Sequence, residues 1–251
     1  CCATRVGATE HDYVDNLLGH GVAGVIVISG RHAEAAGDHG LYERLHRRRL
    51  PLVIVNGTIE GSGIAAVSSD DRGATVAAYE HLAALGHERI GFVTGPSIYV
   101  PVQRKLAGFR DAAMRAGVDP GDIDERIAES MFTLEGGAAG TRRLLAVGVT
   151  GIVAASDMMA LGAISAARDS GARVPDDVSV IGYDDTDLMR FTDPPLTTVR
   201  QPVERIAEHI ATELLAQIGG RTAEPTEALF PGELIARSST ARCGTVVPVG
   251  R

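Results

Sequence analysis

Short runs of apolar, β-branched residues alternate along the chain with longer segments in which apolar residues recur every three or four positions. Runs of the first kind are typical of buried strands, and segments of the second kind are typical of helices that pack one face on a sheet. We predict strands at residues 24–28, 52–55, 65–68, 90–94, 151–155 and 178–183. We predict helices at residues 32–49, 72–85, 102–116, 134–147, 158–170 and 203–218.

This alternation of strands and helices predicts an α/β fold in which helices cover both faces of parallel sheets. Glycine is common just after the end of a helix, and five glycines stand at such positions. They are Gly86, Gly117, Gly148, Gly171 and Gly219. Two helices also begin beside aspartates, whose side chains can accept hydrogen bonds from the free backbone N–H groups of a first turn. The expected caps are Asp70 or Asp71, and Asp157.

Composition makes a globular protein the expected class. The chain has 251 residues, of which 45% are hydrophobic and 22% charged, with a formal net charge of −8. This negative charge would repel phosphate backbones, so the chain by itself is not expected to bind nucleic acid. No apolar run approaches the roughly 20 residues of a membrane span, and three cysteines make no disulfide framework. We therefore expect a soluble, cytoplasmic protein with no membrane partner.

Several motifs that carry chemistry are missing or stand in the wrong context. The GHGVAG stretch at Gly19–Gly24 matches a dinucleotide-binding string, but it precedes a strand, whereas the phosphate-binding loop must follow one. The eight histidines are dispersed, no Cys pair has zinc spacing, and no Gly-x-Ser-x-Gly motif occurs. The expectation is therefore no metal, no cofactor and no enzymatic activity.

One loop instead indicates ligand binding. The sequence VIGYDD places Asp184 at the carboxyl end of the strand predicted at 178–183. In open α/β sheets ligands bind beyond the carboxyl ends of strands, and a carboxylate there accepts strong hydrogen bonds from hydroxyl or amine groups. Pro194 and Pro195 fix two φ angles shortly afterwards, which predicts a stiff segment after the loop.

Five stretches, in this order, resemble the effector-binding core of transcription regulators of the lactose/galactose-repressor (LacI/GalR) family. They are SDDRGATVAAYEHLAALGHERIGFVTGP, RKLAGFRDA, ASDMMALGAISAARDSGARVPDDVSV, VIGYDDTDLMRFTDPPLTTVRQP and ELIARSST. The resemblance runs from about Thr9 to Thr240. It implies two Rossmann-like lobes with parallel sheets, joined by three crossing strands, and a small effector bound in the cleft. The effector would be sugar-like or nucleobase-like.

The resemblance also implies lobe boundaries. The N-terminal lobe would comprise residues 1–68 and 203–230, and the C-terminal lobe residues 70–200 and 233–240. The crossings would lie at about 68–70, 199–203 and 230–233. Residues 241–251 have no periodic pattern and are expected to form an unordered tail.

The same resemblance assigns effector contacts residue by residue. Lys105 stands where the family usually has an arginine that holds the ligand, and a lysine lacks the planar fork that binds in two places; Arg104 beside it is a lesser candidate. Phe132 matches an aromatic that packs on the ligand ring, with an ordinary core residue as the alternative. Asp157 and Asp185 are expected to be caps or loop braces. The full set of expected contacts is Asn56, Tyr99, Lys105, Phe132, Ser156, Asp184 and Gln201.

The family core begins with a strand and a helix that this chain lacks, before a strand that corresponds to Cys1–Thr4. We therefore expect the natural gene product to continue upstream through that unit and a helix-turn-helix domain that binds operator DNA. A homodimer is also expected. The alternative is a periplasmic sugar-binding protein of a transporter, which would have a secretion signal upstream and no DNA-binding domain. An enzyme on the same scaffold would need a positioned nucleophile, and none is evident.

Overall fold

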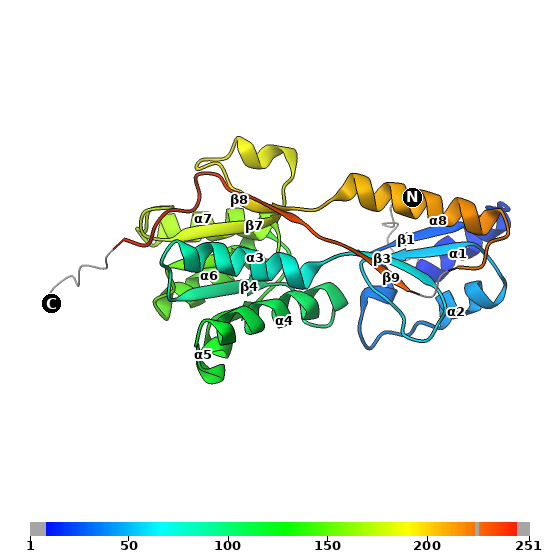
Figure 1. Cartoon of the computed structure of the whole chain (residues 1–251), viewed down its shortest axis with the longest axis horizontal. Helices are drawn as coiled ribbons and strands as arrows, with labels where there is room; N and C mark the ends of the chain where they lie inside the picture. Colours follow the sequence, from blue (N-terminus) through cyan, green and yellow to red (C-terminus); the bar gives the residue numbers. More distant parts are fainter. Residues whose placement is uncertain (1–8, 224–225, 245–251) are drawn as a thin grey trace. The chain divides into compact units, whose positions relative to one another are not determined.

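The computed structural model describes residues 9–223 and 226–244, and the chain forms two compact units, each with its own sheet (Figure 1). The first unit comprises Cys1–Ser69, Ile98–Pro101 and Val203–Phe230. The second unit comprises Asp70–Ser97, Val102–Pro202 and Pro231–Arg251. Both units are therefore built from segments that are far apart in the sequence.

The first unit has a four-stranded sheet in the order β1-β2-β3-β9, in which every neighbouring pair is parallel. Its strands are β1 (Val25–Ile28), β2 (Leu52–Val55), β3 (Ala65–Ser69) and β9 (Glu227–Phe230). Its helices are α1 (Glu10–Gly19), the short 3-10 helix η1 (Arg31–Ala33), α2 (Gly40–Arg47) and α8 (Val203–Ile218).

Strand β2 shows why helices cover both faces of this sheet. Successive side chains of a strand point to opposite faces, and all four residues of β2 are buried. Leu52 and Ile54 join a cluster with residues of α1 and α2, including Tyr42. Val53 and Val55 join a second cluster with Ile206 of α8 and its neighbours. An apolar residue at every position is thus what a strand between two helical layers requires.

The second unit has a six-stranded sheet in the order β10-β8-β7-β6-β4-β5. All neighbours are parallel except β10, which runs antiparallel to β8. The strands are β4 (Ile90–Thr94), β5 (Ile127–Glu129), β6 (Gly151–Ala154), β7 (Ser179–Asp184), β8 (Thr197–Arg200) and β10 (Glu233–Ile235). The helices are α3 (Asp71–Ala84), α4 (Val100–Arg115), α5 (Pro120–Glu125), α6 (Leu134–Ala146), α7 (Asp157–Asp169) and the 3-10 helix η2 (Asp187–Arg190).

The α/β class and most of the elements expected from the sequence are confirmed. All six predicted strands are present as β1, β2, β3, β4, β6 and β7, and five predicted helices are present as α3, α4, α6, α7 and α8. Four of the predicted helix-ending glycines have positive φ: Gly86, Gly117, Gly148 and Gly171. After α8 the glycine with positive φ is Gly220, not Gly219.

The prediction of one continuous helix at residues 32–49 is wrong. Only η1 and α2 form there, separated by a loop. In that loop the Asp38 carboxylate accepts a hydrogen bond from the Gly40 N–H (3.0 Å), a local turn that competes with continuous helix. A side chain at Gly37 would also meet the Arg31 carbonyl at 2.9 Å. Helices α1 and α5 and strand β5 were not expected from the sequence, and β8, β9 and β10 were expected only in part, through the crossings at 199–203 and 230–233.

Two further expectations need correction. Asp70 caps α3, since its carboxylate accepts from Gly73 N (2.9 Å), but α7 is capped by Ser156, not by Asp157. Part of the expected tail is hydrogen-bonded: Ala241 N donates to Ser179 Oγ (3.0 Å) and Cys243 N donates to the Leu85 carbonyl (2.9 Å). Residues 245–251 and the strand expected at Cys1–Thr4 lie outside the described residues. Within the described ranges, every helix is too short or too polar to cross a bilayer.

Candidate functional site

The carboxyl ends of the parallel strands of the second unit meet along one edge of its sheet, because parallel strands all point the same way. Taken in the order of the sheet, Gln201 follows β8, Asp184 ends β7, Ser156 lies just beyond β6, and Phe132 lies beyond β5. We call this edge of the second-unit sheet, where these four residues lie, the carboxyl edge. The topology therefore brings together four of the side chains that the sequence singled out.

Asp184 is the acceptor at the centre of this edge. Its Oδ1 accepts a 2.6 Å hydrogen bond from Nε2 of Gln201, which joins the ends of β7 and β8. Burial raises the pKa of Asp184 from 3.8 to about 6, the Gln201 hydrogen bond opposes this shift, and the negative charge of Asp157 reinforces it. With a pKa of about 6, the carboxylate is ionised at neutral pH.

Asp184 also lies in an unfavourable backbone conformation. Its φ is 119° and that of Asp185 is 57°, in a region that side chains other than glycine seldom adopt. Such residues cost of order 1–3 kcal/mol each and persist only where the surrounding structure holds them. The turn after β7 therefore depends on a brace.

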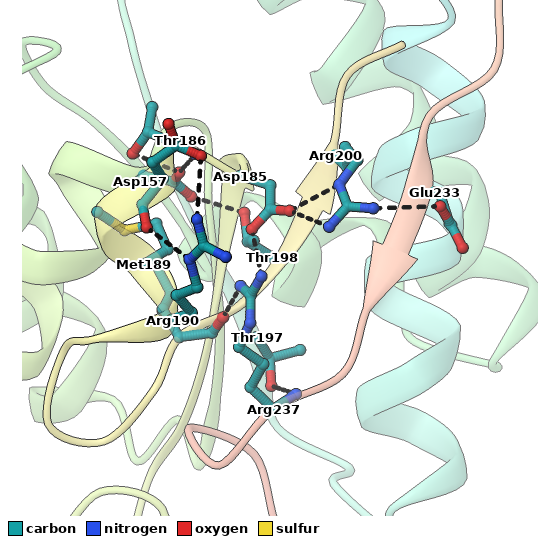
Figure 2. Close-up of polar contacts among 12 residues, drawn as sticks. Asp157, Asp185, Thr186, Met189, Arg190, Thr197, Thr198, Arg200, Glu233 and Arg237 are labelled. Carbon is teal, nitrogen blue, oxygen red and sulfur yellow. Dashed lines mark hydrogen bonds and ion pairs between the residues drawn. The ribbon is translucent and has the colours of Figure 1, made fainter.

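The brace is a buried carboxylate between two arginines (Figure 2). Asp185, with a side chain only 4% exposed, accepts from Nε of Arg200 (2.8 Å) and from a terminal nitrogen of Arg237 (2.6 Å). Arg237 also donates to the Leu196 carbonyl (2.7 Å). Charge-assisted bonds of this kind are stronger than neutral ones, so they fix the turn that carries Asp184. Asp185 is a loop brace here, as the sequence suggested.

Asp157, the first residue of α7, is hydrogen-bonded to residues that flank the same turn. Its carboxylate accepts from Thr198 Oγ1 (2.6 Å) and from Thr186 N (2.9 Å), as Figure 2 shows. Burial raises its pKa, and the hydrogen bond from Thr198 opposes that shift. A Cβ at Gly182 would lie 2.5 Å from this carboxylate, so the glycine of β7 leaves the space that Asp157 occupies.

Lys105 is engaged inside the second unit. Its ammonium is bonded to Oδ1 of Asp71, and it lies 3.9 Å from the centroid of the Tyr183 ring. The Tyr183 hydroxyl donates to the same Asp71 oxygen (2.9 Å). Lys105 and Asp71 are only 6% and 3% exposed. The charge expected to hold a ligand is therefore paired with an acid in this structure.

Phe132 and Ser156 occupy defined places on the edge. Phe132 is 42% exposed, so it is not the core residue considered as the alternative, and its ring lies against Gly95, where a Cβ would be 2.1 Å away. Gly95 directly follows β4 and leaves room for the ring. The Ser156 hydroxyl accepts from Met159 N (3.2 Å) as the α7 cap. Phe132 thus offers an exposed aromatic surface at the carboxyl edge.

The two remaining expected contacts belong to the first unit. Asn56 follows β2 with a φ of 67°, and its side chain donates to Ser29 Oγ (3.2 Å), which follows β1. Tyr99 pairs as an isolated antiparallel bridge with Glu34. The structure therefore places Asn56 at the carboxyl end of a first-unit strand and Tyr99 in the short segment that joins this unit.

From the sequence, Asp71 was expected only as a possible cap and Tyr183 had no expected role, yet both contact Lys105. One signal was available: of the adjacent acids Asp70 and Asp71, only one could cap α3. Among residues 9–223 and 226–244 there is no group of three or more His, Cys, Asp or Glu side chains that could hold a metal ion. The chemistry of the carboxyl edge is thus that of oxygen acceptors, an amide and an aromatic face.

Comparison with known proteins adds independent findings. Residues 79–240 match the family model of a periplasmic binding protein-like domain. The chain is 46% identical over 240 residues to the HTH-type transcriptional regulator MalR of Streptomyces coelicolor. This alignment covers 95% of the chain and 70% of MalR.

Two solved structures are also similar. A complex of the transcriptional regulator CelR with cellobiose has a TM-score of 0.82 at 33% identity and covers 92% of this chain and 70% of that one. A LacI family transcriptional regulator from Enterococcus faecium with bound ribose has a TM-score of 0.80 at 29% identity, covering 92% of this chain and 85% of that one.

Proposed function

The chain belongs to the LacI family of helix-turn-helix transcriptional regulators and corresponds to the effector-binding core of such a regulator. From this premise we propose that the chain binds a sugar-like effector at the carboxyl edge of the second unit. The observation that carries the proposal is the geometry of Asp184, a carboxylate hydrogen-bonded to Gln201 at the tip of β7. A carboxylate and an amide side by side can accept from and donate to neighbouring hydroxyl groups of one sugar ring.

The exposed ring of Phe132 supports this choice of ligand. Sugars present C–H faces that pack on aromatic rings, while their hydroxyl groups need polar partners, and the carboxyl edge offers both kinds of group. The similar regulators include one with cellobiose bound and one with ribose bound. We propose Phe132, Ser156, Asp184 and Gln201 as effector contacts, and we propose that Lys105, whose charge lowers the pKa of Asp184, is also part of this site. Asn56 and Tyr99 are proposed as contacts contributed by the first unit.

A regulator is favoured over a transporter's solute-binding protein, since the relatives reported above are transcriptional regulators. We propose that the whole protein binds operator DNA through a helix-turn-helix domain and works in the cytoplasm. An effector changes such binding only if it has different affinities for the two states of the regulator. No catalytic role and no cofactor enter the proposal.

We propose that the chain forms a homodimer, and its exposed apolar side chains support this. On η2 and just after it, Leu188 is 70% exposed and Phe191 is 75% exposed. On α8 of the first unit, Val203 and Leu215 are 63% and 66% exposed. Leu188 and Phe191 lie in one 3-10 turn, and large apolar side chains that are exposed together are typical of surfaces that contact another protein.

Isothermal titration calorimetry tests effector binding. The panel contains ribose, cellobiose, other neutral disaccharides, polyols and purines. Saturable binding of a sugar supports the proposal, and binding of purines alone, or of nothing in the panel, would contradict it. Sedimentation equilibrium of the same chain tests the dimer, which a monomer at tens of micromolar would exclude.

A further inference from the structure

Lys105 is the single lysine of the chain, since the other 23 of its 24 basic Lys and Arg residues are arginines. It is also buried, and its ammonium is bonded to Asp71. Tyr183 completes this group, with its ring beside the ammonium and its hydroxyl donating to Asp71. A buried ion pair that is hydrogen-bonded on both sides neutralises its two charges locally.

Close packing of two helices makes this pairing possible. A Cβ at Gly108 of α4 would lie 2.4 Å from the Arg72 carbonyl, so the glycine lets α4 approach the first turn of α3. Lys105 lies one turn before Gly108 on α4, and Asp71 is the first residue of α3. The helix N-terminus itself favours an acid at that position. The acid is therefore anchored where the lysine side chain reaches it.

The acids of the carboxyl edge differ in whether their hydrogen-bond donors are charged. Asp185 is paired with Arg200 and Arg237. Asp184 receives its hydrogen bond from the amide of Gln201. Asp157 receives its bonds from Thr186 and Thr198. Asp184 and Asp157 are thus bonded to uncharged donors, while the nearest lysine is already committed to Asp71.

We propose that Asp71 is a specificity-determining residue, which selects uncharged hydroxylated effectors over phosphorylated or carboxylated ones by holding the charge of Lys105. The inference rests on the proposed function, because it concerns the ligand of that same edge. An anionic ligand could use Lys105 only by leaving the buried Asp71 carboxylate without its cation, with the Tyr183 hydroxyl as an uncharged donor, which is strongly unfavourable. The same ligand would also be repelled by Asp184 at neutral pH. A neutral sugar meets neither obstacle.

The test compares neutral sugars with their phosphate esters by calorimetry at pH 7.5. The pairs are ribose with ribose 5-phosphate and cellobiose with cellobiose 6′-phosphate, and inorganic phosphate is a probe that needs no sugar. For any pair whose neutral member binds, we expect the ester to bind at least about 100-fold more weakly. A phosphate ester that binds the natural chain as tightly as its neutral partner overturns the proposal.

Variants separate the charge of Lys105 from the fold. Asp71→Asn keeps the shape and frees the ammonium, so it should gain binding of inorganic phosphate, and Asp71→Asn/Lys105→Met should lose that gain. Tyr183→Phe is the matched control: it removes a hydrogen bond to Asp71 but keeps the charge pair, so it should gain none. A folded Asp71→Asn chain that gains no phosphate binding contradicts the proposal.

The single lysine gives a readout that needs no variant. Chain labelled with lysine carrying ¹⁵N at Nζ has one side-chain ammonium signal, which reports on Lys105 alone. We expect this signal in the natural chain to be protected from solvent exchange and unmoved by millimolar phosphate; a saturable phosphate-induced shift would overturn the proposal. Because this phosphate test does not depend on sugar binding, failure of the proposed function and failure of this inference are distinguishable.

Discussion

Nε2 of Gln201 donates a 2.6 Å hydrogen bond to Oδ1 of Asp184 and so ties the end of β8 to the end of β7. The pair places an acceptor and a donor side by side on a rigid sheet. Burial raises the pKa of Asp184, and the Asp184 backbone has a φ of 119°. Both properties lead to measurable consequences.

The backbone strain at Asp184 should appear as a difference between two variants. Asp184→Gly and Asp184→Ala both remove the carboxylate, but only glycine adopts a φ of 119° easily. We expect the glycine variant to be more stable by about 1–2 kcal/mol in the free energy of unfolding, measured with urea at pH 7.5. An alanine variant of equal or greater stability would show that the turn is not strained.

The raised pKa of Asp184 predicts a pH-dependent stability. Between the unfolded pKa of 3.8 and the folded pKa of about 6, the folded chain binds more protons than the unfolded chain at this group. The free energy of unfolding therefore falls as pH rises through this window, by up to about 3 kcal/mol from Asp184.

The measurement is the difference between the natural chain and Asp184→Asn, from urea titrations at pH 4 to 8. The difference is needed because burial lowers the pKa of His32, His81 and His87, and these groups change stability with pH in the opposite direction. We expect the natural chain to lose stability relative to the variant as pH rises. A constant difference would contradict the assigned pKa.

The contact between Gly95 and Phe132 predicts the effect of one methyl group. In Gly95→Ala the new Cβ would lie 2.1 Å from the ring, so the ring must move. We expect sugar affinity to fall about tenfold by calorimetry, with a loss of stability of about 1–3 kcal/mol. Gly121→Ala is the control, because a Cβ there meets nothing within 4 Å. Unchanged affinity in Gly95→Ala would remove Phe132 from the proposed contacts.

The brace around Asp185 predicts a stability effect with a matched control. Asp185→Asn leaves Arg200 and Arg237 without their buried acid, so we expect a loss of about 2 kcal/mol in the free energy of unfolding. Asp187, two residues on, is 97% exposed in its ion pair, and Asp187→Asn should change stability by less than about 0.5 kcal/mol. Equal effects of the two substitutions would show that the brace contributes nothing.

The sequence predicted best those strands that have an apolar residue at every position, which is what burial between two helical layers requires. β2 is an example, with four buried residues in LVIV. The strands that were missed lack that signal: no residue of β9 or β10 is fully buried. Helix α1 buries only Val14, so its apolar pattern is weak.

The sequence could predict a site residue that lies at the end of a single strand. It could not predict a contact between two helices that are distant in the sequence. Asp184 follows an apolar strand directly, so the position of its carboxylate at the sheet edge could be inferred. The pairing of Lys105 with Asp71 joins residues 34 positions apart and depends on the close approach of α4 to α3 at Gly108. Nothing in the local pattern around either residue indicates that packing.

The central claim is that Asp184 binds the hydroxyl groups of a neutral sugar. The most direct test is calorimetry at pH 7.5 with the neutral sugar of the panel that binds the natural chain most tightly, using Asp184→Asn and the exposed-site control Asp187→Asn. We expect Asp184→Asn to weaken binding about 100-fold while circular dichroism shows an intact fold, and Asp187→Asn to bind as the natural chain does. A folded Asp184→Asn chain with unchanged affinity would contradict the account.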